Sequence, residues 1–268
     1  MEQINETIEL DQTAGKTAVK KKVEVKNLSK LYLGKKNYFE AVSDVSFDIR
    51  EGEFLVLLGP GRCGKTVLLN IIAGIEEKSG GSVIYNGQEI KGPNPEFSMV
   101  FQKRAILPFK TVMENVELGL KFKGMPKKER RAISQKYIDL VGLQGFENAY
   151  PSALSGGMKQ RVGIARAYAM NPQLLIMDEP FGALDAQTRY AMQNEILRIW
   201  EQEKRTVLFV TNNLEEAVYL GNRIILLSKA PAIVKAEYEV ELPRPRNMTG
   251  PEFMDLRMRI SDNTDLSI

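Results

Sequence analysis

Three short stretches of the chain, residues 54–58, 174–177 and 207–210, are continuously apolar. A glycine-rich or polar turn follows each stretch, and a helical pattern of apolar residues follows the turn. Unbroken apolar runs of this length are typical of strands that are buried on both faces of a parallel sheet. The repetition of strand, turn and helix therefore predicts an α/β fold built in layers.

Two earlier stretches, residues 23–28 and 41–49, alternate apolar and polar side chains instead. A period of two is the pattern of a strand with one buried and one solvated face. We therefore expect an antiparallel β subdomain beside the parallel core.

The region of about residues 103–155 has helical character. Apolar residues over 112–120 share one helical stretch, which ends at the sequence Gly-Met-Pro of residues 124–126, and a charged helix is expected over 127–141. This region predicts a helical subdomain that is inserted into the α/β core.

Both ends of the chain differ from the core, which spans residues 23–228. Residues 1–22 lack a hydrophobic period and finish in three lysines, so we expect a flexible tail. Residues 229–268 form a C-terminal extension, with an expected strand over 237–242 and a short amphipathic helix over 253–260.

Composition narrows the class of protein. With 268 residues, 43% hydrophobic and 26% charged, the chain has the make-up of a soluble globular protein. The formal net charge of +3 is too small to favour a nucleic-acid partner. The single cysteine, Cys63, excludes an internal disulfide and fits a reducing compartment. No apolar run approaches the ~20 residues that cross a bilayer, so any membrane pore must belong to another chain.

The segment GPGRCGKT, residues 59–66, fits the phosphate-loop pattern G-x-x-x-x-G-K-[ST] and stands between an apolar strand and a helix. Backbone N–H groups of such a loop, together with the helix N-terminus, bind phosphate. Lys65 is expected to reach the β- and γ-phosphates of a nucleotide, and Thr66 to complete a Mg²⁺ shell. The expected nucleotide-binding residues of this loop are Gly59, Gly61, Cys63, Gly64, Lys65, Thr66 and Val67.

The apolar run of residues 174–177 ends in two adjacent acids, Asp178 and Glu179. Neighbouring side chains of an extended chain point to opposite sides, so the two carboxylates serve different purposes. One of them suits the Mg²⁺ shell and the other can polarise an attacking water.

The run LSGGMKQR, residues 154–161, adds a second phosphate site at a helix terminus. Ser155 is a natural N-cap, and Gly156 and Gly157 let the backbone approach a ligand before a helix expected over 158–170. With the phosphate loop and the acidic strand end, this run resembles the nucleotide-binding subunit of ATP-binding cassette (ABC) transporters. The resemblance covers roughly residues 23–228.

This resemblance implies a P-loop NTPase fold and a head-to-tail dimer that encloses two ATP molecules with Mg²⁺. Ser155, Gly156 and Gly157 of one subunit then complete the site of the other. The resemblance also implies that Glu179 is the catalytic glutamate and that Asp178 holds the metal with Thr66. The remaining implied roles are adenine stacking by Tyr32, γ-phosphate and Mg²⁺ sensing by Gln102, and communication across the dimer by Asp185.

The segments GPNPEFSMVFQ, LPFKTVMENV and ELPRPR resemble importer subunits for nitrate, sulfonate, taurine and related small anions. That likeness implies a peripheral position on the cytoplasmic face of the membrane. The implied partners are a second ATPase subunit, transmembrane permease subunits and an extracytoplasmic substrate-binding protein, with no nucleic acid.

The chain contains no histidine, and Asn212 stands where the family's switch histidine is usual. The Asn212 amide can donate to a γ-phosphate oxygen but cannot become charged; alternatively, Asn212 only caps the following helix. A transport ATPase is favoured, and a regulatory subunit that binds ATP with little hydrolysis is the alternative. A third interpretation, a soluble relative acting on DNA or ribosomes, lacks its usual long coiled coil or fused cassettes.

Overall fold

A computed structural model of the protein describes residues 20–34, 37–102, 106–182 and 184–264. Most of the predicted N-terminal tail lies outside these residues. Strand β1 begins at Lys21, inside the segment expected to be tail, and Lys22 is buried there, with its Nζ 5.6 Å from the centre of the Tyr85 ring. Two of the three lysines that suggested a solvated run are therefore strand residues.

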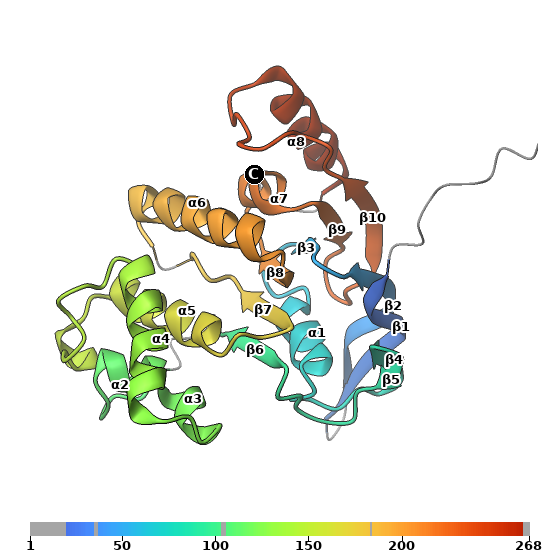
Figure 1. The fold of residues 1–268 in the computed structure, drawn as a ribbon. Helices are drawn as coiled ribbons and strands as arrows, with labels where there is room; N and C mark the ends of the chain where they lie inside the picture. Colours follow the sequence, from blue (N-terminus) through green and yellow to red (C-terminus); the bar gives the residue numbers. More distant parts are fainter. Residues whose placement is uncertain (1–19, 35–36, 103–105, 183, 265–268) are drawn as a thin grey trace, which may run out of the picture.

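Two sheets make up the β structure (Figure 1). The first has four antiparallel strands in the order β2-β1-β4-β5, namely β1 (Lys21–Leu33), β2 (Tyr38–Arg50), β4 (Gly80–Tyr85) and β5 (Gln88–Glu89). The second has the order β10-β9-β3-β8-β7-β6, namely β3 (Phe54–Leu58), β6 (Phe97–Val100), β7 (Leu174–Asp178), β8 (Thr206–Thr211), β9 (Arg223–Leu227) and β10 (Val234–Glu239). All neighbours in the second sheet are parallel except β10, which runs antiparallel to β9.

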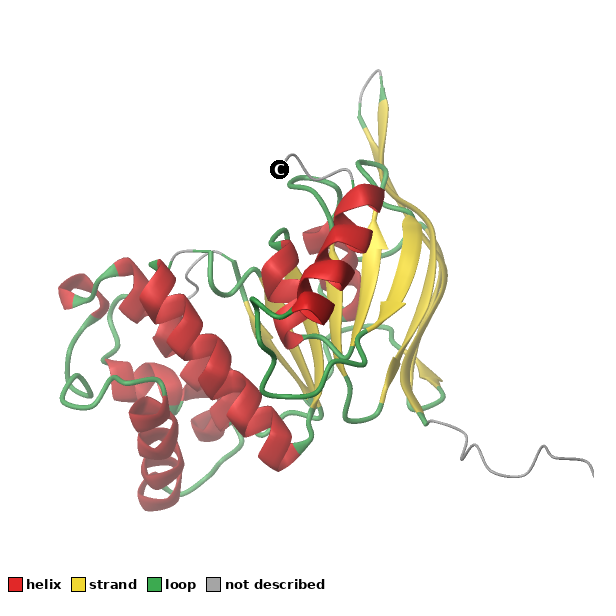
Figure 2. Cartoon of the chain, turned by 90° about the horizontal axis from the view of Figure 1, so that it is seen from above, coloured by secondary structure: helices red, strands yellow, loops and turns green. Residues whose placement is uncertain are grey.

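The helices surround the second sheet and form a separate lobe. They are α1 (Lys65–Ile72), α2 (Val112–Val116), α3 (Leu118–Phe122), α4 (Lys127–Leu140), α5 (Gly156–Ala169), α6 (Ala186–Glu203), α7 (Leu214–Leu220) and α8 (Pro251–Asn263), with a short 3-10 turn at Pro151–Ala153. Helices α2 to α4 and part of α5 make up the lobe beside the sheets (Figures 1 and 2). Helices α2 to α4 of this lobe lie within residues 103–155, the range expected for a helical insertion.

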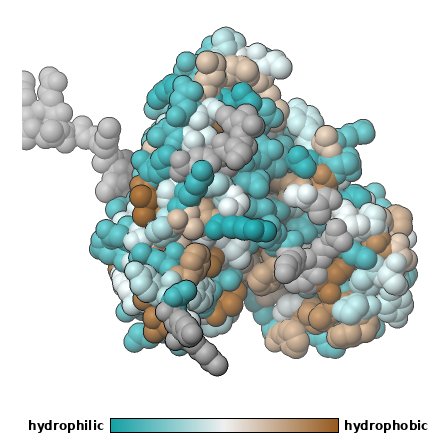
Figure 3. Space-filling model, turned by 180° about the vertical axis from the view of Figure 1, so that it is seen from behind, coloured by the Kyte–Doolittle hydropathy of each residue, from teal (hydrophilic) through white to brown (hydrophobic). Residues whose placement is uncertain are grey.

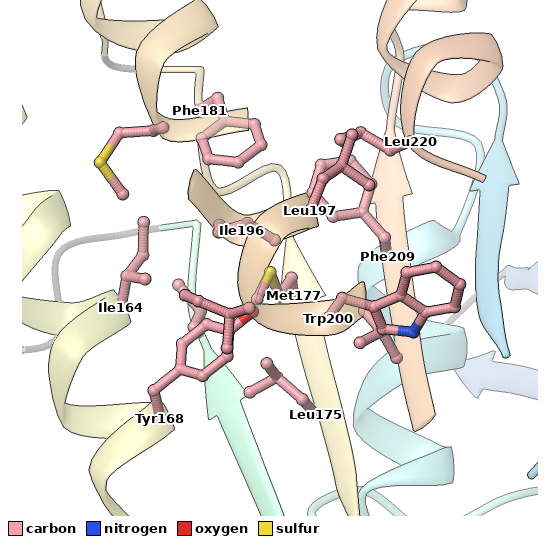
Figure 4. Close-up of a cluster of buried hydrophobic side chains, with 14 of the residues drawn as sticks. Ile164, Tyr168, Leu175, Met177, Phe181, Ile196, Leu197, Trp200, Phe209 and Leu220 are labelled. Carbon is pink, nitrogen blue, oxygen red and sulfur yellow. The ribbon is translucent and has the colours of Figure 1, made fainter. Parts of the chain in front are cut away.

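The parallel strands are continuously apolar because both faces of their sheet are covered. On one face, Leu55 and Leu57 join a core with α1 and the inner side of the antiparallel sheet. On the other face, Phe54 and Val56 join a core with α5 to α8. Figure 4 shows part of this second core, where Trp200 of α6 lies beside Phe209 of β8. The structure therefore has the predicted α/β layers.

Three expected elements have different limits. The C-terminal strand is β10, Val234–Glu239, and not residues 237–242, because its antiparallel partner β9 begins at Arg223, which pairs with Glu239. The helical stretch over 112–120 is two short helices, α2 and α3, which meet at Glu117. Helix α8 extends two residues before and three residues beyond the predicted range of 253–260.

Residues after 228 pack into the same core as the parallel strands. Phe253, Leu256 and Ile260 of α8 are buried with the side chains of α7. The Arg246 guanidinium donates to the carbonyls of Val218, Tyr219 and Gly221 at 2.7, 3.0 and 2.6 Å, at the C-terminal end of α7. The C-terminal segment therefore satisfies helix-end carbonyls that would otherwise lack partners.

Candidate nucleotide site

The carboxyl ends of β3, β6, β7 and β8 meet at one edge of the parallel sheet. Ligands of open α/β sheets bind at this edge, in the crevice outside the strand ends. The phosphate loop follows β3, Gln102 follows β6, the acidic pair ends β7, and Asn212 follows β8. The fold thus brings together residues that lie far apart in the sequence.

The phosphate loop requires glycine at one position in particular. Gly64 has φ +111°, and a Cβ atom there would lie 2.4 Å from the Ala41 carbonyl oxygen. This residue also accepts the Leu68 N–H at 2.9 Å and so begins helix α1. Gly61 has open space around its Cβ position, and Arg62 adopts φ +63°. The loop therefore turns left-handed before the helix, with Gly61 facing an open side.

Lys65 is buried and closes the loop from inside. Its Nζ donates to the carbonyls of Gly59 and Pro60, each at 2.8 Å, and lies 3.5 Å from Glu179 Oε1. The ammonium group is therefore already between the loop and the acidic strand end, where a nucleotide phosphate would need a cation.

Thr66 and Asp178 form a second link between the loop and β7. The Thr66 hydroxyl donates to Asp178 Oδ2 at 2.9 Å. Asp178 Oδ1 is buried without a hydrogen-bond partner among the described residues. Burial raises the pKa of Asp178, nearby Glu179 raises it further, and the Thr66 bond and Lys65 lower it.

This pair fits a Mg²⁺ ion because a hydroxyl and an unpartnered carboxylate oxygen are hard oxygen donors. The described residues contain no group of three or more His, Cys, Asp or Glu side chains that could hold a metal by themselves. Mg²⁺ usually keeps several waters and shares phosphate oxygens with the protein. Thr66 and Asp178 can therefore bind Mg²⁺ when nucleotide phosphates and water supply the remaining ligands.

Glu179 directly follows β7, and its side-chain contacts differ from those of Asp178. Its backbone is left-handed, with φ +44°, and its N–H donates to the Val210 carbonyl at 2.9 Å. Its Oε2 accepts a hydrogen bond from Gln102 Nε2 at 2.9 Å. The side chain lines an open pocket of about 370 Å³, whose lining residues are Gln102, Glu179, Gly182, Arg189, Thr211, Asn212, Asn213 and Glu216.

Asn212 lines this pocket and does not cap the next helix. The N-cap of α7 is Asn213, whose side chain accepts the Glu216 N–H at 3.0 Å. The alternative of a capping role for Asn212 is therefore wrong. Its exposed side chain lies on the same pocket as Glu179 and Gln102.

The side chains of Cys63 and Val67 point to the core rather than to the open side of the loop. Cys63 is 1% exposed, and Val67 packs against the same cluster. Burial raises the pKa of the Cys63 thiol. Any contact of Cys63 with a nucleotide therefore comes from its backbone.

Tyr32 lies on β1 of the antiparallel sheet. Its ring stacks on Phe39 with 6.4 Å between centroids, and its hydroxyl bonds to Glu76. The hydrogen bond and burial raise the pKa of Tyr32 to about 12, with burial the larger cause. Its role in adenine stacking remains a prediction.

The LSGG residues and Asp185 are not among the residues that line the pocket of Glu179. Ser155 is the N-cap of α5 and accepts the Met158 N–H at 3.2 Å, as predicted. The helix begins at Gly156, so both glycines lie in its first turn rather than before it. A Cβ at Gly157 would lie 3.1 Å from Leu184, next to Asp185, which caps α6. The two segments therefore pack against each other.

Arg189 and Glu216 also line the pocket, and sequence reasoning did not select them. One signal in the sequence could have found Glu216: the spacing of Asn213 and Glu216 matches a capping box. In a capping box, the glutamate side chain accepts a hydrogen bond from the backbone N–H of the N-cap residue. In the structure the carboxylate of Glu216 bonds instead to the Thr211 hydroxyl at 2.6 Å.

Comparison with known proteins shows which family has this sequence and fold. The family model for ABC transporters matches residues 42–182. An uncharacterised ABC transporter ATP-binding protein of Methanocaldococcus jannaschii is 46% identical, over 93% of this chain and 94% of that protein. A taurine import ATP-binding protein of Rhizobium johnstonii is 45% identical, over 82% and 87%. A nitrate import ATP-binding protein of Synechocystis is 40% identical, over 89% and 93%.

Among solved structures, the dimeric structure of a post-hydrolysis state of an ATP-binding cassette, bound to ADP and Pi, has a TM-score of 0.75 to this chain. The two are 33% identical, over 82% of this chain and 99% of that one. The sheet edge, phosphate loop and acidic pair define a P-loop ATPase. The chain belongs to the ABC transporter family and is an ATP-hydrolysing subunit of it. The alternative of a regulatory subunit with little hydrolysis finds no support in these comparisons.

Proposed function

We propose that this chain energises the import of a small anion, of the nitrate, sulfonate or taurine type, by hydrolysing ATP as a dimer beneath a membrane permease. The observation that carries the proposal is the position of Glu179. Its two oxygens lie within reach of Gln102 and Lys65, at 2.9 and 3.5 Å, at the edge of the pocket that Asn212 lines.

The chemistry follows from these positions. Lys65 binds the β- and γ-phosphates once it leaves the carbonyls of Gly59 and Pro60. Glu179 accepts the proton of the attacking water, Gln102 orients that water, and the Asn212 amide donates to a γ-phosphate oxygen. Thr66 and Asp178, together with Gln102, would hold Mg²⁺, which would neutralise charge on the phosphates.

The dimer and the permease contact complete the proposal. Ser155, Gly156 and Gly157 of one subunit face the phosphate loop of the other, and Asp185 contacts the opposite subunit. Figure 3 shows apolar residues gathered on the lobe at lower right, over the helical subdomain. Phe109 and Phe122 of this lobe are 70% and 81% exposed, which fits a contact with the permease.

The membrane must be crossed by another protein in this arrangement. No helix in the described part of the chain combines the length and apolar character needed to span a bilayer. Support for an anionic substrate comes from relatives named for taurine and nitrate import. A substrate-binding protein outside the membrane is expected to deliver that anion to the permease.

ATP hydrolysis by the purified subunit, with Glu179→Gln as the matched variant, tests the catalytic part. We expect the variant to bind ATP and to lose at least ~100-fold in rate, the scale of losing a positioned general base. Equal rates would contradict the assignment of Glu179. The substrate is tested in vesicles that carry the permease, by stimulation of hydrolysis with taurine, nitrate or an uncharged analogue.

A further inference from the structure

The residues on either side of Asn212, Thr211 and Asn213, form hydrogen bonds with each other and with Glu216. The Thr211 hydroxyl donates to Glu216 Oε2 at 2.6 Å and accepts the Asn213 N–H at 2.9 Å. The Asn213 side chain in turn accepts the Glu216 N–H at 3.0 Å. The residues before and after Asn212 are therefore both tied to Glu216.

The other oxygen of Glu216 is tied to helix α6. Glu216 Oε1 accepts a hydrogen bond from Gln193 Nε2 at 3.1 Å and lies 3.9 Å from Arg189 Nε. Arg189 also donates to the Leu184 carbonyl at 3.1 Å, one residue before Asp185. The two oxygens of one carboxylate thus join the loop after β8 to the N-terminal part of α6.

Glu216 is only 7% exposed, so its charge is held at an energetic cost. A residue that served only to fill space would be apolar at such a position. Its neighbour Glu215 has a side chain that is 58% exposed and pairs with Arg257 at 3.4 Å, as an ordinary surface acid does. The same residue type at adjacent positions therefore has two different environments.

We propose that Glu216 is a positioning residue, which holds the Asn212 loop against α6 so that the Asn212 amide meets the γ-phosphate. The proposal rests on the role given above to Asn212 in hydrolysis. Glu216 does not touch the nucleotide itself and acts through the loop. Because ADP lacks the γ-phosphate, ADP binding does not depend on this loop.

The ionised form of Glu216 makes these contacts best, because a carboxylate accepts on both oxygens. Burial raises the pKa of Glu216, and the charge of Glu179 after β7 raises it further. The Thr211 bond from β8, together with Arg189 and Gln193 of α6, lowers it. As pH falls through this raised pKa, Glu216 gains a proton and its hold on the loop weakens.

The test compares Glu216→Ala and Glu216→Gln with the surface control Glu215→Gln in the full chain. We expect Glu216→Ala to lower kcat at least ~tenfold and to leave ADP affinity within ~twofold of the unchanged protein. In an Asn212→Ala background, Glu216→Ala should add no further loss, since both changes remove one contact. Additive losses, unchanged kcat, or a matching fall in ADP affinity would each overturn the proposal.

Glu216→Gln keeps the size of the side chain and covers the case in which the alanine variant does not fold. Its rate should fall below that of the unchanged protein at about pH 8, and the two rates should converge as pH falls through the raised pKa of Glu216. A ratio that does not change with pH would overturn the proposal. If the unchanged protein does not hydrolyse ATP, the proposed function fails as well; if it does and the variants match it, only this inference fails.

Discussion

The hydroxyl of Thr66 donates to Asp178 Oδ2 at 2.9 Å and thereby joins the first turn of α1 to the end of β7. This bond is the only one that the Asp178 side chain makes among the described residues, since Oδ1 has no partner. The bond therefore fixes the carboxylate that is proposed to hold Mg²⁺.

Thr66→Val should weaken ATP hydrolysis at low concentrations of Mg²⁺, so that more Mg²⁺ is needed for the same rate. The substitution keeps the shape of the side chain and removes the donor, so the pKa of Asp178, already raised by burial, should rise further. The carboxylate then takes up a proton at a higher pH, and the Mg²⁺ concentration needed for half-maximal hydrolysis should increase, most strongly at acidic pH. A Mg²⁺ titration of the ATPase rate at several pH values measures this, with Thr66→Ser as control. An identical titration for Val and Ser would contradict the prediction.

Asn212→Ala should lower the hydrolysis rate at least ~tenfold, the effect of losing one transition-state contact of ~1.4 kcal/mol. Asn213→Ala is the matched variant, because it removes the N-cap of α7 instead. It should reduce the free energy of unfolding by about 1 kcal/mol. Steady-state kinetics and denaturant unfolding of both variants separate the two effects. If Asn212→Ala loses stability and keeps its rate, the assignments must be exchanged.

Gly64→Ala should destabilise the phosphate loop. The new Cβ would lie 2.4 Å from the Ala41 carbonyl oxygen, and the backbone at φ +111° is unfavourable for alanine. We expect a loss of about 1–3 kcal/mol in the free energy of unfolding. Gly61→Ala, which has open space at its Cβ position, should stay within ~0.5 kcal/mol. Thermal unfolding without nucleotide gives the comparison, and equal melting temperatures for the two variants would be inconsistent with it.

Cys63 should react slowly with thiol reagents in the folded protein. The side chain is 1% exposed and its thiol pKa is raised by burial, so both access and thiolate are reduced at neutral pH. Once Cys63 is alkylated, the added group has no room beneath the loop and ATP binding should be lost. Mass spectrometry over time, with and without ATP, measures the rate and its protection. Rapid labelling with full ATPase activity would show that the thiol is open to solvent.

Sequence patterns predicted the parallel strands well because burial on both faces leaves a clear apolar signal. The run of residues 54–58 coincides with β3 at both ends. The pattern failed at β10, where the alternation of side chains continues after Glu239 although pairing with β9 has ended. Where a strand ends because its partner strand ends, the side-chain pattern of the strand itself does not show the boundary.

The sequence predicted those residues of the candidate site that belong to recognisable motifs. The hydrogen bonds of Lys65, Thr66, Gln102 and Glu179 connect residues that the sequence motifs had selected. The sequence left open whether Asn212 caps the helix after β8, and it selected neither Glu215 nor Glu216. The course of the backbone after β8 makes Asn213 the N-cap of α7, and it buries Glu216 while Glu215 stays exposed.

The strand order also governs how the chain can fold during synthesis. Strand β3, which carries the phosphate loop, lies between β8 and β9, whose residues 206–211 and 223–227 are made much later. Until then, the five apolar residues of β3 have both edges unpaired, a state that favours aggregation. A fragment that ends before β8 therefore leaves both edges of β3 unpaired, whereas a chain that includes β9 can pair both of them.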